Sequence, residues 1–110
     1  MRVVLDECIN EKLRHAFVGH ECQTCSYAGL KGLSNGKLLT AVEKAGFQIL
    51  ITVDRSMHYQ QNMRGRGLAL VVLEGPTTSL DGLLSLMPDV LAALDLVKPG
   101  QVLRIGGSAH

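Results

Sequence analysis

The sequence contains no tryptophan and only two tyrosines and two phenylalanines. Recognition of single-stranded nucleic acid by stacking bases on aromatic rings is therefore restricted to very few positions. The charges nearly cancel, to a formal net charge of +1. No overall positive field attracts nucleic acid, so any such binding must come from a local basic patch.

Long apolar runs and an even set of cysteines are also missing. No apolar stretch approaches the roughly 20 residues of a membrane-spanning helix. The chain also reaches Asp6 and Glu7 too early for a secretory signal. Three cysteines are an odd number, which does not indicate a disulfide framework. We therefore expect a cytoplasmic protein with reduced thiols and no contact with a membrane.

The apolar residues that are present alternate between strand-like and helical patterns. A chain of 110 residues that is 46% hydrophobic suits one domain with a modest core. Strand–helix alternation predicts an α/β fold with three layers and a mainly parallel sheet. We expect this domain to cover residues 1–105, followed by a flexible tail over 106–110. The predicted strands are 3–5, 21–25, 47–53, 68–73 and 101–105, and the predicted helices are 9–17, 35–44 and 79–97, the last with an interruption near Pro88.

Two of the predicted strands end in an aspartate. Asp6 follows the run VVL, and Asp54 follows ILITV. Ligands bind outside the carboxyl ends of parallel strands, and two carboxylates placed there repel each other and favour a shared cation. Oxygen ligands suit Mg²⁺ or Mn²⁺, which activates water and stabilises a phosphodiester transition state. A strand-end aspartate is also a common helix cap, so both interpretations stay open.

The segment after Asp54 is basic and rich in amides. Residues 55–73 contain no acidic residue. We predict that Arg55, Gln60 and Gln61 contact phosphate or substrate beside the metal. The alternative is a solvated loop whose charges have no specific role.

Four pieces of sequence occur in an order that resembles a PIN-like family of unknown function, whose members are often encoded beside a short antitoxin. The pieces are LDE (5–7), GLKGLSNGKLL (29–39), ILITVDR (49–55) and HYQQN (58–62). The resemblance implies a sheet of order 3-2-1-4-5 and divalent-metal-dependent ribonuclease chemistry. It also implies the toxin component of a bacterial toxin–antitoxin module, with RNA as substrate and a small antitoxin-like protein as partner.

The resemblance also implies roles for individual residues. Asp6 matches the carboxylate after the first strand, and Asp54 matches the aspartate of a T-x-D element. We assign Asp6, Glu7 and Asp54 to the metal, and Asp6, Asp54 and Asn35 to catalysis. Asn35 stands where such sites have a third acid, and Ser56 where a fourth is usual. Fewer carboxylates predict weaker metal binding.

These neutral replacements leave two other functions open. One is a PIN-like scaffold that has lost catalysis and binds a partner protein. The other is a receiver-type signalling domain, in which Asp54 would accept a phosphoryl group and Thr77 or Thr78 and Lys98 would be switch residues. Fold-level similarity alone does not decide between them. Glu43 is a further candidate for the third carboxylate.

Two other features are assigned to structure or assembly. Cys22 and Cys25 form a C-x-x-C pair on a strand-like run, where neither zinc nor redox use is typical. We predict reduced thiols that hold no metal. The apolar surface of the Leu-rich segment Leu83–Leu96 predicts a homodimer.

Overall fold

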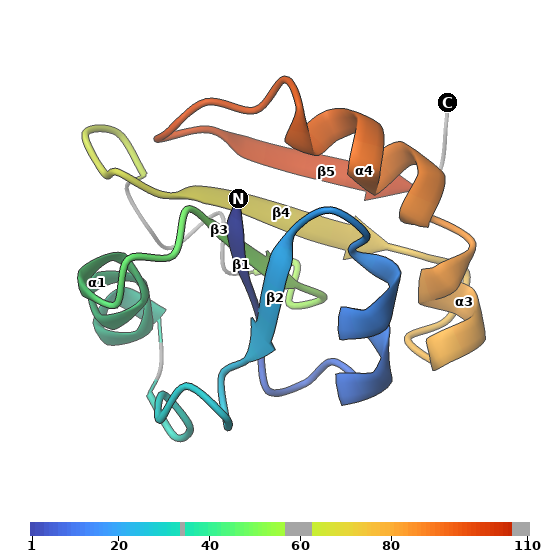
Figure 1. The fold of residues 1–110 in the computed structure, drawn as a ribbon, viewed down its shortest axis with the longest axis horizontal. Helices are drawn as coiled ribbons and strands as arrows, with labels where there is room; N and C mark the ends of the chain where they lie inside the picture. The colour runs from blue at the N-terminus through green and yellow to red at the C-terminus, as the bar shows by residue number, and fades with distance from the viewer. Residues whose placement is uncertain (34, 57–62, 107–110) are drawn as a thin grey trace.

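The computed structural model describes residues 1–33, 35–56 and 63–106. The strands are β1 (Arg2–Leu5), β2 (Glu21–Thr24), β3 (Ile49–Thr52), β4 (Ala69–Glu74) and β5 (Val102–Gly106). The helices are the 3-10 helix η1 (Glu11–Ala16) and the α-helices α1 (Asn35–Lys44), α3 (Leu80–Leu84) and α4 (Met87–Leu94). Figure 1 shows their arrangement. Each predicted strand is present within a few residues of its expected bounds.

The strands form one five-stranded sheet of order β2-β1-β3-β4-β5, and each pair is parallel. The predicted α/β fold class is thereby confirmed. The order is similar to the expected 3-2-1-4-5, since β1 again lies beside β2 and β4 beside β5. It differs in β3, which lies between β1 and β4 instead of at the edge.

Burial explains the position of β3. All four of its residues, ILIT, are buried, whereas β2, ECQT, has one exposed and three partly buried residues. An apolar strand needs cover on both faces and both edges, and a polar strand tolerates an edge. The apolar strand therefore lies inside the sheet and the polar strand outside.

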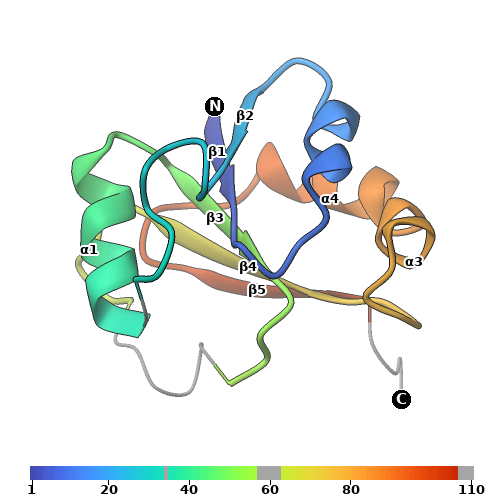
Figure 2. The ribbon, with the colours of Figure 1, turned by 90° about the horizontal axis from the view of Figure 1, so that it is seen from below.

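Helices pack on both faces of the sheet, as Figure 2 shows. Alternate strand residues form two separate cores, because successive side chains point to opposite faces. Val3 and Ile51 belong to the core shared with η1, α3 and α4. Val4 and Leu50 belong to the core shared with α1.

The predicted helix over 79–97 is divided in two. Ser79 caps α3 by accepting the Gly82 N–H at 3.3 Å. Pro88 lies in the first turn of α4, where its missing N–H costs nothing. The predicted helix over 9–17 is the shorter 3-10 helix η1, capped by Asn10, whose side chain accepts the Lys12 N–H at 2.9 Å.

The helices α3 and α4 use their apolar side chains for the core. Leu83, Val90 and Leu94 are fully buried. Of the large apolar residues in this segment, Leu84 and Leu96 are exposed, at 39% and 78%. Much of the apolar surface of Leu83–Leu96 is therefore buried, while Leu84 and Leu96 stay exposed, and the homodimer remains a prediction.

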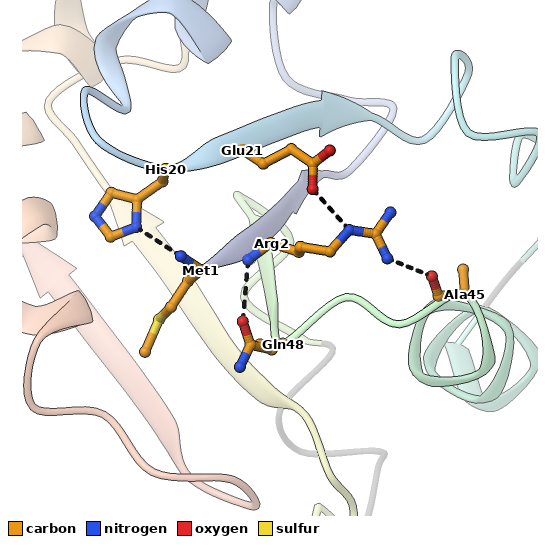
Figure 3. A network of polar contacts seen from close by, with 6 residues as sticks. All are labelled: Met1, Arg2, His20, Glu21, Ala45 and Gln48. Atoms are coloured by element: carbon orange, nitrogen blue, oxygen red, sulfur yellow. Dashed lines mark hydrogen bonds and ion pairs between the residues drawn. The ribbon is translucent and has the colours of Figure 1, made fainter.

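Arg2 forms hydrogen bonds to β2, to the segment after α1 and to the residue before β3, at the amino ends of the strands (Figure 3). Its Nε donates to Glu21 Oε2 at 2.8 Å, and its Nη1 donates to Ala45 O at 2.7 Å. Its backbone N–H donates to Gln48 Oε1 at 3.1 Å.

Gly46 ends α1 with a φ of 86°, which favours glycine. None of the described helices is long and apolar enough to cross a membrane.

Candidate carboxylate site

The candidate site lies at the carboxyl ends of β1 and β3. These strands are neighbours, with Leu5 opposite Ile51, and they bring Asp6 beside Thr52. The strand order reverses here, because β2 lies on one side of β1 and β3 on the other. This is the position at which open parallel sheets bind ligands.

Asp6 is nearly buried and is held by neutral donors. The residue is 8% exposed. Its Oδ1 accepts the Glu7 N–H at 2.8 Å, and its Oδ2 accepts the Thr52 hydroxyl at 2.7 Å. The Cys8 thiol donates to Oδ2 at 3.6 Å. A carboxylate oxygen accepts about two hydrogen bonds, so Oδ1 retains an open lone pair.

Thr52 connects the two aspartates of the site. It is fully buried. While its hydroxyl donates to Asp6, its Oγ1 accepts the Asp54 N–H at 3.0 Å. Asp54 is exposed, and its Oδ1 closes a local turn by accepting the Ser56 N–H at 3.0 Å and the Ser56 hydroxyl at 2.6 Å. Within the described ranges its Oδ2 has no protein partner.

The negative charge of Asp6 acts on nearby thiols. Cys25 is 1% exposed. Burial, and then the charges of Asp6, Glu7 and Cys8, raises its pKa from 9.0 to about 12. Burial also raises the pKa of Cys8, and the Asp6 charge adds to this. Both thiols are therefore neutral at physiological pH in the metal-free protein.

A second buried carboxylate also lies at the carboxyl ends of the strands. Glu74 ends β4 and is 8% exposed. Its Oε2 lies 2.5 Å from Arg104 Nη2 and 2.7 Å from Arg104 Nε, a short charged contact from β5. Arg55 Nε is more distant, at 3.9 Å. The charge of Glu74 is thus neutralised within the chain.

Asp6 has no such counter-charge among the described residues. The ion pairs of the described chain join Arg2 to Glu21, Arg66 to Glu43, and Arg55 and Arg104 to Glu74. A nearly buried carboxylate without a cation is costly, since buried charges are normally paired. Among the described residues the negative charge of Asp6 is therefore unbalanced, and Thr52 links Asp6 to the backbone of Asp54.

Two predicted site residues lie nearby, with partners of their own. Glu7 is exposed, and its Oε2 accepts the Gly32 N–H at 3.1 Å. Arg55 is 59% exposed and has only the loose contact with Glu74. Both side chains can move at little cost, because exposed contacts of this kind contribute little. Their roles toward metal and substrate stay predictions.

Other predicted residues are placed in part or not at all. Asn35 begins α1, but its side chain lies outside what the structure describes, and so do Gln60 and Gln61. Residues 107–110 of the expected tail are also outside, while Gly106 still belongs to β5.

The suggestion that Glu43 supplies a third carboxylate is wrong. Its Oε2 accepts the Gly67 N–H at 3.1 Å, and its Oε1 lies 3.6 Å from Arg66 Nη1. Gly67 comes just before β4 and marks the amino edge of the sheet. Helix α1 runs antiparallel to the strands. Glu43, near the end of α1, therefore lies at the amino ends of the strands, whereas Asp6 lies at their carboxyl ends.

Of the receiver-type arrangement, the strand order 2-1-3-4-5 is present, but the switch lysine is not in place. Lys98 precedes β5, and its N–H donates to Gln101 Oε1 at 2.9 Å. It therefore lies at the amino edge, whereas Asp54 lies at the carboxyl edge. Thr77 shares a 2.6 Å hydrogen bond with Ser79, the cap of α3. The predicted switch lysine is on the wrong side of the sheet to reach Asp54.

The donor set fits a weakly held hard cation. No group of three or more His, Cys, Asp or Glu side chains suited to a metal occurs among the described residues. Mg²⁺, however, is commonly bound by one or two carboxylates, with waters and substrate phosphates completing its shell. Asp6 and Asp54 are the two carboxylates that such a mode would use, and the described side chains form no cage made only of protein ligands.

Sequence reasoning missed the parts of the site that organise the carboxylates. The hydroxyl of Thr52 was visible only as a polar interruption of an apolar strand. Glu74 shows the same pattern as Asp6, an acidic residue directly after a buried run, but it was not among the predicted site residues. Its arginine partner on β5 had no signal, because that pairing depends on strand order.

Comparisons with protein-family models, with curated proteins and with solved structures give no match in any of the three. A function for this chain is therefore argued from the geometry of the carboxyl edge.

Proposed function

We propose that this chain is a PIN-like domain that hydrolyses RNA phosphodiesters with Mg²⁺ or Mn²⁺. In the same proposal it is the cytoplasmic toxin component of a toxin–antitoxin module, and its partner is a small antitoxin-like protein. One observation carries the metal-dependent part: Asp6 is nearly buried and has no cationic partner among the described residues, while Glu74 at the same edge is paired with arginine.

The chain's own groups have distinct roles in this proposal. Asp6 and Asp54 hold the cation, and Glu7 assists. Thr52 fixes the position of Asp6 through its 2.7 Å hydrogen bond. A bound divalent cation supplies activation of water and neutralisation of phosphate charge. Asn35 positions water, and Gln60 and Gln61 contact the substrate.

Arg55 adds a positive charge close to Asp54. Its guanidinium is mostly exposed and its contact with Glu74 is long, at 3.9 Å. A phosphate is a stronger partner for arginine than a distant carboxylate, because charged hydrogen bonds to phosphate are short and paired. Arg55 is therefore suited to exchange Glu74 for a substrate phosphate, while Arg104 keeps Glu74 neutralised.

A catalytically weak scaffold is the second candidate. The observation that favours it is the small donor set, with two carboxylates and no third ligand among the described side chains. Such a domain binds a partner protein and performs no chemistry. The two candidates make different predictions about metal and RNA, and one experiment separates them.

The experiment measures the melting temperature against Mn²⁺ and Mg²⁺ up to several millimolar. A cation that binds only the folded state raises stability by mass action. We expect an increase for the parent protein and a smaller one for Asp6→Asn and Asp54→Asn. Asp89→Asn is the matched control: this exposed residue lies on α4, on the other face of the sheet, and should respond like the parent.

An RNA cleavage assay with the same proteins completes the test. Metal-dependent cleavage that is lost in Asp6→Asn supports the nuclease. A melting shift without cleavage supports the scaffold with a vestigial metal site. No metal-dependent shift for any protein sinks the two-aspartate site, and the nuclease proposal falls with it.

A further inference from the structure

Strand β2 ends the sheet on one side. Among the described strands it pairs with β1 alone, and η1 packs beside it. In Figure 1, β2 lies at the front, with the sheet behind it. An open edge exposes backbone groups that readily pair with another strand. The question is which of these groups are free.

The hydrogen bonds to β1 identify the inward groups. The Glu21 N–H donates to Met1 O at 3.0 Å, and the Cys25 N–H donates to Leu5 O at 2.9 Å. Along a strand, consecutive residues direct their backbone groups to opposite sides. Residues 21, 23 and 25 therefore face β1, and Cys22 and Thr24 face outward, as does His20 just before the strand.

Two outward groups are already used within the chain. The His20 N–H donates to Phe17 O at 3.1 Å, and the Ala28 N–H donates to Thr24 O at 3.0 Å. In the described part of the chain, the groups left over are the His20 C=O, the Cys22 N–H and C=O, and the Thr24 N–H. This is a short series centred on Cys22.

That series is complementary to itself. We propose that β2 pairs with β2 of a second copy in antiparallel orientation, with Cys22 opposite Cys22 of the second copy. The two Cys22 residues then exchange N–H···O bonds, as in any hydrogen-bonded antiparallel pair. The Thr24 N–H of each copy donates to the His20 C=O of the other. Every free outward group is satisfied, and the five-stranded sheets become one continuous sheet.

Other registers satisfy fewer groups. If Cys22 lies opposite Thr24 of the second copy, its N–H meets a carbonyl already bonded to Ala28. If Cys22 lies opposite His20, its C=O meets an N–H already bonded to Phe17. A shift by one residue places outward groups opposite inward ones. The internal hydrogen bonds of His20 and Thr24 thus select a single register.

The side chains and the space at this edge agree with that register. Glu21 lies opposite Gln23 of the second copy, a carboxylate beside an amide, and no like charges face each other. A cavity of about 410 Å³ runs beside β2 and is lined by Cys22, Thr24 and Tyr27 with parts of η1.

Light scattering across a dilution series tests the proposal, with Cys22→Pro as the variant. Proline removes the outward N–H of residue 22 and no bond to β1, so it suits an edge strand. The parent mass should rise above 11.9 kDa as concentration increases. Cys22→Pro should raise the dimer Kd by more than about tenfold, because hydrogen bonds are lost from both copies. Cys22→Ala keeps the N–H and should dimerise like the parent.

Amide hydrogen exchange of the parent protein provides a readout that does not depend on a variant folding. The Cys22 and Thr24 amides should exchange more slowly as concentration rises. The amides of Glu21 and Gln23 face β1 and should not change. A strictly monomeric mass at millimolar concentration overturns the proposal and leaves this edge to an extended segment of another protein. A dimer with unchanged Cys22 and Thr24 exchange also overturns it, since the contact then lies elsewhere.

Discussion

Asp6 and Glu74 both lie at the carboxyl ends of their strands and are equally buried, at 8% exposure each. Among the described residues, however, only Glu74 has a charged partner. Glu74 has Arg104 in short contact and Arg55 at 3.9 Å. Asp6 has an amide, a hydroxyl and a thiol, which are all neutral. The charge of Glu74 is neutralised by arginine, whereas Asp6 is oriented by neutral donors and has no counter-charge among the described residues.

In our proposal, this difference separates a structural carboxylate, Glu74, from a ligand-binding one, Asp6. Burying a charge costs several kcal/mol unless a partner offsets it. Glu74 recovers that cost within the chain, so it links β4, β5 and the loop after β3. Asp6 is fixed in position by Thr52, and in our proposal a bound cation offsets the cost. The predictions below test this contrast, from the largest expected effect to the smallest.

Removing the arginine partner of Glu74 should have the largest effect. Arg104→Met keeps the aliphatic stem but leaves a buried carboxylate with only the long contact to Arg55. Stranding a buried charge in this way costs about 3 kcal/mol in the free energy of unfolding. Urea denaturation at neutral pH measures it, as a lower midpoint with an unchanged slope.

An exposed ion pair provides the control for this change. Glu21→Gln removes the charge that Arg2 contacts, and these side chains are 56% and 40% exposed. A surface pair contributes well under about 1 kcal/mol. If Arg104→Met costs no more than Glu21→Gln, Glu74 is not held by its ion pair and the contrast with Asp6 is lost.

The fold was largely predictable because its signals are local. Buried runs such as Ile49–Thr52 show their character in the sequence, and Gly46 marks the end of α1 by its positive φ. The position of β3 was implied only by resemblance, and the structure places it inside the sheet. Strand order depends on which surfaces are covered, and that is settled by all the strands together.

The site was predictable only in its carboxylates. Asp6 and Asp54 follow apolar strands, and that pattern correctly places Asp6 at the carboxyl edge of the sheet. The hydrogen bond from Thr52 joins residues 46 positions apart, and the lack of a counter-charge at Asp6 among the described residues depends on the arrangement of all the strands. Glu43 was misplaced because distance along a helix does not show which edge of the sheet the residue reaches.

Removing the hydroxyl of Thr52 tests the orientation of Asp6. Thr52→Val keeps the shape of this fully buried side chain but leaves Asp6 Oδ2 with only the 3.6 Å contact to the Cys8 thiol and the Asp54 N–H without its hydroxyl partner. Unsatisfied buried groups cost about 2 kcal/mol. Thermal and urea unfolding should both show this loss. Thr40→Val is the control, because that hydroxyl is exposed and accepts only a 3.3 Å bond from Arg66. Equal costs for the two variants would show that the Thr52 hydroxyl does not hold Asp6.

The pKa of the Cys25 thiol responds to the negative charge of Asp6, which adds to the effect of burial. Its pKa of about 12 lies above the usual 9.0, so the folded state keeps a proton that the unfolded state loses above pH 9. Stability is therefore unaffected below pH 9 and falls as pH rises from 9 toward 12. Asp6→Asn should lower this pKa and make the fall shallower. With solvent screening, the change at pH 10 should be below about 1.4 kcal/mol, the equivalent of one pKa unit.

Glu74→Gln is the matched control for the thiol, because Arg104 already neutralises Glu74. The pKa of Cys22 is an internal control, since burial raises it to about 12 and Arg14, not Asp6, is the charge that acts on it. Thiolate absorbance during a pH titration distinguishes the variants. An identical titration of Asp6→Asn and the parent would mean that Asp6 exerts no net field on its surroundings.

The smallest effect is expected for Asp6→Asn in metal-free buffer at neutral pH. The asparagine oxygen still accepts the Glu7 N–H, and its amide can donate to Thr52, whose oxygen has a second lone pair. The variant also removes a nearly buried charge that has no counter-charge among the described residues. These terms oppose each other, so the free energy of unfolding should change by less than about 1 kcal/mol in either direction. Urea denaturation in the presence of a chelator measures it. A loss above about 2 kcal/mol would show that the charge of Asp6 is itself compensated within the fold. Asp6 would then be a structural carboxylate like Glu74, and the main reason to expect a bound cation at this edge would be gone.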